Sequence, residues 1–253
     1  MSVNGKYIYG FMRNGAKPTF TIPGIDGKPI FTISDNGVAA VVSDGPDGKL
    51  RPERKHLSAH HSVIKEVMKT STILPVSFGV VADNETFIRK ILKFNHDSFT
   101  TQLNRLEGKV EMGIKVIWDV ENIFEFIVKT HRMLEIFRDN IFLKPSGATH
   151  EEKLELGRMF ETILNQEREK HVTTVNNILK NYCCDIKENT PPDENVVMKL
   201  ACLVERTKLD QFEKGVFEAA KQFDDNYAFD FNGPWAPHNF VNIKLKNSLD
   251  KFF

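Results

Sequence analysis

Residues 110–118 read VEMGIKVIW, and this short stretch decides how the chain is divided. Its apolar residues alternate with Glu111, Gly113 and Lys115, which predicts a β-strand with one buried face. From Asp119 onward the apolar residues recur instead at three- and four-residue steps, as they do in a helix. We therefore expect an α+β protein of two domains, one formed by residues 1–118 and the other by residues 119–253.

The N-terminal domain, residues 1–118, is expected to be an antiparallel sheet covered on one side by two helices. Aromatic and β-branched runs predict strands at Lys6–Met12, Val38–Val42 and Leu74–Val81. Asp26-Gly27 offers the positive-φ pair that a tight hairpin needs. Ser58 is expected to cap a helix that ends near Lys69, and a second helix is expected to run from Asp83 or Asn84 until Gly108 stops it.

The C-terminal domain is expected to begin with a long antiparallel helical hairpin, residues 119–182. Its first helix, from Asp119 to about Leu143, is apolar around much of its circumference, and its second opens with the capping-box pattern Thr149-x-x-Glu152. The middle of the second helix, residues 166–170, is entirely polar, which predicts that the centre of the hairpin reaches solvent. Residues 183–253 then alternate strand, helix and strand, and predict a ferredoxin-like α+β unit built on a βαβ pattern.

Charge and composition restrict the class of partner. The 253 residues carry 34 basic and 34 acidic side chains, so the sequence lacks the basic surplus of a protein that grips nucleic acid or an anionic membrane. No apolar run approaches the ~20 residues that span a bilayer. Cys183, Cys184 and Cys202 are too few for a disulfide framework or a zinc knuckle, and predict a reducing, cytoplasmic location.

The sequence offers no catalytic, cofactor or metal motif. Two Gly-Lys segments lack the first glycine and the final hydroxyl residue of a phosphate-binding loop. His56 and His60 are four residues apart, but if Ser58 caps the helix then His56 lies outside it, so packing histidines are favoured over metal ligands. Ser77 is expected to be a packed hydroxyl within a strand. We predict that the protein is not an enzyme.

Residues 233–240, GPWAPHNF, are the most unusual segment. Pro234 and Pro237 hold the backbone near polyproline II, and Trp235 and Phe240 are large aromatic residues on that stiff loop. One interpretation is a loop whose Trp235 and Phe240 close the sheet edge. The other is a partner-binding site formed by Pro234, Trp235, Pro237, His238 and Phe240, because prolines reduce the entropy that a loop loses on docking.

Taken in order, several segments resemble the gas vesicle protein F/L family. They are YIYGF at 7–11, VAAVVSD at 38–44, LPVSFGVV at 74–81, LACLVER at 200–206 and FNGPWAPHNFV at 231–241. The resemblance covers nearly the whole chain. The family usually has GPWPPYSF in the last segment, so Ala236, His238 and Asn239 depart from its pattern.

The resemblance implies a minor structural or assembly component of gas vesicles, which give aquatic microbes buoyancy. Such a protein is expected to bind the hydrophobic major shell protein and other accessory proteins, and to aid vesicle nucleation. It implies no catalytic residue, no cofactor, no nucleic acid and no lipid membrane as a partner, and a cytoplasmic place on the vesicle; self-association stays open. The alternatives are a ferredoxin-like regulatory module that binds a small molecule, and a hydrolase that uses His60 and His61.

Overall fold

A computed structural model describes residues 5–15, 20–46 and 50–243. The chain forms two compact units, and the boundary differs from the expected one. Unit 1 contains the described residues up to Glu111 together with residues 234–243, and unit 2 contains Met112–Gly233. The expected boundary after Trp118 therefore lies at the end of a strand that passes from one unit into the other.

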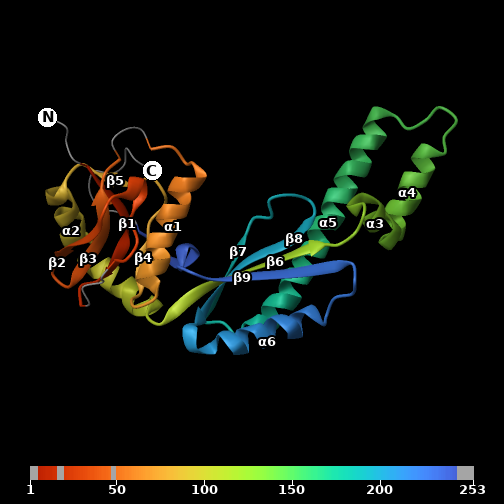
Figure 1. The fold of residues 1–253 in the computed structure, drawn as a ribbon. Coiled ribbons are helices and arrows are strands. Elements are labelled where there is room, and N and C mark those ends of the chain that lie inside the picture. The colour runs from red at the N-terminus through yellow and green to blue at the C-terminus, as the bar shows by residue number, and fades with distance from the viewer. Residues whose placement is uncertain (1–4, 16–19, 47–49, 244–253) are drawn as a thin grey trace. The chain divides into compact units, whose positions relative to one another are not determined.

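Unit 1 contains a five-stranded sheet and two long helices (Figure 1). The order along the chain is β1 (Lys6–Arg13), a 3₁₀ turn (Ile25–Gly27), β2 (Ile30–Asp35), β3 (Val38–Asp44), α1 (Arg54–Met68), β4 (Ile73–Pro75), β5 (Val81–Ala82) and α2 (Glu85–Leu106). The strand order is β2-β3-β1-β4, with β5 also paired to β1, and every recorded pairing is antiparallel.

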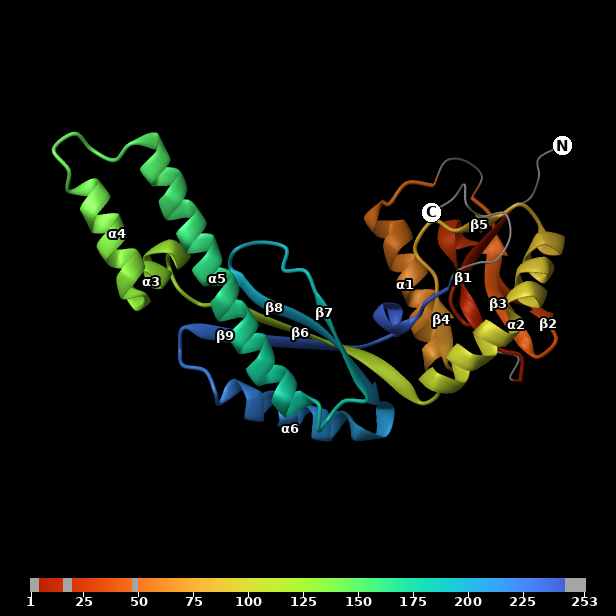
Figure 2. The same ribbon diagram turned by 180° about the vertical axis from the view of Figure 1, so that it is seen from behind.

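Helices α1 and α2 lie on opposite faces of this sheet, and not on one side as expected (Figure 2). The pairing of β1 with β3 shifts between Ile8 and Gly10, so Tyr9 is a bulged residue and the alternation of side chains changes there. Before the bulge, Tyr7 contacts His60 of α1; after it, Phe11 stacks on Phe99 of α2 with ring centroids 4.3 Å apart. Both faces of β1 are buried for this reason.

Two local predictions in unit 1 are corrected. Asp26 and Gly27 do take positive φ angles, of 54° and 75°, but they lie in a 3₁₀ turn. The tight hairpin is instead at Asn36-Gly37, whose φ angles are 41° and 86°, between β2 and β3. The expected strand Leu74–Val81 is split into β4 and β5, because Gly79 takes a φ of 95° in a turn between them. Ser77 is exposed in this connection and is not a packed strand residue.

Unit 2 has the ferredoxin-like β-α-β-β-α-β order, although it draws its first strand from β6 (Lys109–Trp118), before the expected boundary. The other elements are α3 (Ile123–Thr130), α4 (Arg132–Phe142), α5 (His150–Leu179), β7 (Asp185–Asn189), β8 (Val196–Glu205), a 3₁₀ turn (Arg206–Lys208), α6 (Leu209–Ala220) and β9 (Tyr227–Trp235). The strand order is β7-β8-β6-β9. Helices α5 and α6 pack on one face over a core that includes Ile114, Val116, Val175 and Phe212.

The helical hairpin of α4 and α5 is present, and its two helices lie side by side in both views (Figures 1 and 2). The capping box at Thr149 and Glu152 is formed as predicted. The first helix of the hairpin is broken, however, at His131, whose φ and ψ of −122° and 92° end α3 and begin α4. Thr130 and His131 direct side-chain hydrogen bonds to the carbonyl of Ile127, which favours ending the helix there.

Candidate partner-binding site

The aromatic loop begins at the end of β9, the edge strand of its sheet. Pro234 has no N–H and is tolerated in this strand because an edge strand has one unpaired side. Trp235 is the last residue of β9 and is 47% exposed, and Pro234 is also exposed. The site residues at the start of the loop therefore face solvent.

The second half of the loop is fixed within unit 1. Phe240 is 1% exposed, Ala236 is 3% exposed and Pro237 is buried, while His238–Phe240 form a 3₁₀ turn. Arg105 of α2 donates a hydrogen bond to the carbonyl of Phe240. Of the five candidate contact residues, Pro234, Trp235 and His238 are thus exposed, whereas Pro237 and Phe240 anchor the loop.

A buried carboxylate, which the sequence pattern had placed on a polar face, holds the loop. Glu111 is 7% exposed, and its two carboxylate oxygens accept hydrogen bonds from the backbone N–H of Asn239 at 2.8 Å and from its side-chain amide at 2.6 Å. Asn239 is one of the departures from the family pattern, and here it satisfies a buried charge. The sequence did not reveal this role of Glu111, because Glu111 alternates with the apolar residues of β6 and its side chain was therefore expected to face solvent.

Between this loop and α1 lies a groove of about 520 Å³, formed by residues of unit 1. Its walls include Ser58, Ser62 and Met68 of α1 and Trp235, Ala236 and His238 of the loop. The rings of His61 and His238 lie 6.2 Å apart between centroids. Desolvation lowers the pKa of His238 below its ordinary value, and His61 lowers it further.

His56 and His60 of α1, the pair with the spacing of metal ligands, have hydrogen-bond partners within unit 1. Helix α1 begins at Arg54 and not at Ser58, so His56 and His60 do share a helix face. His56 pairs with Asp26 at 3.0 Å, and His60 contacts the Tyr7 hydroxyl at 2.9 Å and the Val76 carbonyl at 3.2 Å. Burial lowers the pKa of His60 from 6.5 to about 4. Both ring nitrogens of His60 are therefore engaged in hydrogen bonds within unit 1.

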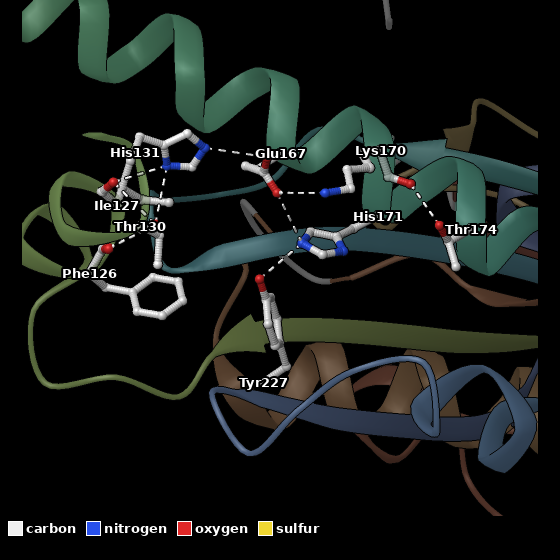
Figure 3. Close-up of polar contacts among 9 residues, drawn as sticks. All are labelled: Phe126, Ile127, Thr130, His131, Glu167, Lys170, His171, Thr174 and Tyr227. Carbon is white, nitrogen blue, oxygen red and sulfur yellow. Dashed lines mark hydrogen bonds and ion pairs between the residues drawn. The ribbon is translucent and has the colours of Figure 1, made fainter. Parts of the chain in front are cut away.

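A second polar cluster, absent from the predictions, lies in unit 2 (Figure 3). Glu167 of α5 stands between two imidazole rings: one carboxylate oxygen is 3.4 Å from Nε2 of His131, and the other is 3.7 Å from Nε2 of His171. The same nitrogen of His171 is hydrogen bonded to the Tyr227 hydroxyl at 2.9 Å. Burial lowers the pKa of His171, against the opposing effect of Glu167.

This cluster joins separate elements of unit 2. It ties α5 to the break between α3 and α4 on one side and to the start of β9 on the other. Across residues 5–15, 20–46 and 50–243, no three His, Cys, Asp or Glu side chains have the geometry of a metal site. The described helices also include none that is long and apolar enough to cross a membrane.

Comparison with known proteins gives the chain its family. The profile of the family described as "Gas vesicle synthesis protein GvpL/GvpF" matches residues 5–242. Gas vesicle protein F of Nostoc sp. is 24% identical, over 95% of this chain and 99% of its own length. Gas vesicle protein F of a Streptomyces species is 27% identical, over 93% of this chain and 98% of its own length.

Solved structures agree with the fold. The crystal structure of the gas vesicle protein GvpF from Anabaena sp. matches with a TM-score of 0.82 at 24% identity, covering 95% of this chain and 99% of that one. The GvpF structure from Microcystis aeruginosa matches with a TM-score of 0.80 at 21% identity, covering 94% and 99%. Because the family profile spans both units, the chain belongs to the GvpL/GvpF family of gas vesicle synthesis proteins.

Proposed function

We propose that this protein is a minor structural or assembly component of gas vesicles that binds the hydrophobic major shell protein and aids vesicle nucleation. The observation that carries the proposal is Trp235, a large aromatic side chain left 47% exposed beside an apolar groove. Exposed aromatic area on a fixed support is typical of a binding hot spot, because little entropy is lost when the partner docks.

The support beneath Trp235 favours binding over simple closure of the sheet edge. Phe240 closes the core of unit 1 from the same loop, so closure does not need Trp235. Hydrogen bonds with Glu111 and Arg105 hold the loop in place. A shell subunit exposes apolar surface before it polymerises, and Trp235 would offer that surface an aromatic contact. The protein that presents Trp235 has a net charge of zero.

Under this proposal the protein works in the cytoplasm on the forming vesicle. Other accessory proteins are further partners, and the exposed side of the helical hairpin is a second contact surface. Met133 and Leu143 there are 75% and 81% exposed.

The test is retention of the shell protein by the full chain and by two matched variants. Trp235→Ala should lower retention about tenfold or more, as loss of an aromatic hot spot does. Phe94→Ala is the control, since Phe94 is a 56% exposed aromatic residue on α2 that does not line the groove. Equal retention by both folded variants would exclude the groove as the contact.

A further inference from the structure

We propose that the groove beside Trp235 takes one amphipathic helix of a partner protein, and that this helix carries a carboxylate which pairs with Lys65. The inference rests on the proposed function, because it specifies the chemistry of the segment that the groove would bind. It follows from the shape of the α1 wall, from the end of β9 and from the charges around the groove.

The α1 wall is shaped for a second helix. Ser58, Ser62 and Lys65 are spaced by four and then three residues, so they lie along one face of α1, and all three are exposed. Two small hydroxyl side chains one turn apart leave room for another helix to approach closely, within the 8–10 Å typical of packed helix axes. Met68 extends the same face, and the wall from Ser58 to Met68 is about 15 Å long, or nearly three turns.

The opposite wall disfavours an extended strand as the occupant. β9 ends at Trp235, and Pro234 just before it has no N–H to donate. A strand added to this edge would lose a ladder bond at the point where it reached the groove. A helix satisfies its own backbone groups and needs from this wall only apolar contact, which Trp235 and Ala236 supply.

The charges select an acidic partner helix. Among the described residues that line the groove, Glu111 is the one carboxylate, and both its oxygens accept hydrogen bonds from Asn239. Lys65 is exposed and has no ion pair within the described part of the chain. The exposed charge on the rim is therefore the Lys65 ammonium group, whereas the Glu111 carboxylate is 7% exposed and is solvated by Asn239.

The probe is a stapled helical peptide of about 15 residues with an apolar face and two glutamates beside that face. Its match is the same peptide with lysine in place of both glutamates. Binding to the full chain is measured by calorimetry and by the fluorescence of Trp235. Trp118, which is 3% exposed, gives a constant background.

We expect the glutamate peptide to bind about tenfold more tightly than the lysine peptide, the range of one attractive against one repulsive surface pair. Lys65→Glu should reverse this preference. The control is Lys90→Glu, which makes the same charge change at an exposed position of α2 and should preserve it. Ser62→Trp, which fills the groove, should abolish binding of the glutamate peptide.

Equal affinities for the two peptides, or no binding of either below about 1 mM, would overturn the inference. Binding that appears only after removal of residues 244–253 would overturn it in favour of the chain's own C-terminal segment. Binding that appears only on dilution would overturn it in favour of a second copy. In each case, loss of shell-protein retention in Trp235→Ala would still support the proposed function.

Discussion

His60 makes the stability of unit 1 depend on pH. It is 1% exposed, and it bridges α1 to the sheet through the Tyr7 hydroxyl and the Val76 carbonyl. Burial is the main cause that lowers its pKa from 6.5 to about 4, followed by the nearby His61. As the pH falls below 6.5 the unfolded chain therefore binds this proton before the folded chain does, and folding loses free energy.

We predict that His60 accounts for a loss of about 3 kcal/mol in the free energy of unfolding of unit 1 between pH 7 and pH 4. Hydrogen exchange of the β1 amides at several pH values measures this. His60→Gln keeps a donor and an acceptor but does not titrate, so its stability should change less over the same range. Parallel curves for the two proteins would show that His60 does not carry the effect.

Residue types in the aromatic loop were predictable, but their exposures were not. The prolines and aromatics of residues 234–240 marked the segment, and both interpretations of it named Trp235 and Phe240 together. The structure separates them, because the 3₁₀ turn at His238–Phe240 directs Phe240 into the core while Trp235 stays at the end of a strand. Glu111 was missed for a related reason: its partner, Asn239, lies 128 residues away.

At the scale of elements, Arg168 of α5 fastens the start of β8. Its guanidinium donates to the carbonyls of Asp193, Glu194 and Val196 at 3.0 to 3.1 Å. The same group lies over the Trp118 ring, 5.5 Å from its centroid. The polar middle of this helix was expected to face solvent, and Arg168 shows that part of it packs against the sheet.

Arg168→Ala should lower the free energy of unfolding of unit 2 by about 2 kcal/mol, since carbonyl bonds to a charged donor and a cation–π contact are lost together. Arg168→Lys should recover less than half, because an ammonium group cannot reproduce the planar fork. Urea unfolding followed by Trp118 fluorescence measures both. Arg158→Ala, an exposed arginine of the same helix paired with Glu155, should change stability by less than about 0.5 kcal/mol.

Elements with strong local signals were predicted well, and those set by tertiary contacts were not. The capping box at Thr149 and the alternation of β6 from Met112 to Trp118 are local patterns, and both are confirmed. Two other features have no such local pattern. Helix α1 starts at Arg54, four residues before Ser58, and the helix that begins at Ile123 is broken at His131. His131 ends α3 where its ring contacts Glu167 of another helix, and such a contact has no signature in local spacing.

At the scale of the whole molecule, unit 1 is built from two separate parts of the chain. Residues 1–118 were expected to fold as one domain, but residues 234–243 return to unit 1 and the boundary moves to Glu111. Composition and periodicity describe neighbours in sequence and cannot show that a segment returns after more than a hundred residues. The ferredoxin-like order of unit 2 was predicted except for its first strand. That strand, β6, belongs to the N-terminal domain under the expected boundary after Trp118.

The return of residues 234–243 makes a prediction about truncated chains. A chain that ends at Gly233 loses Phe240, which is fully buried in unit 1, and leaves the Glu111 carboxylate without its Asn239 donors. Loss of Phe240 burial with its apolar neighbours should lower the free energy of unfolding of unit 1 by about 3 kcal/mol. A chain that ends at residue 243 keeps these contacts and is the matched control.

Hydrogen exchange of the β1 amides separates the outcomes, because it reports unit 1 without requiring both units to unfold together. We expect faster exchange in the chain ending at Gly233 than in the chain ending at 243, with unit 2 amides of β8 unchanged. Phe240→Ala in the full chain should reproduce most of the loss. If unit 1 is equally protected in both truncated chains, then residues 234–243 only lie on its surface, and the support on which Trp235 depends would not exist.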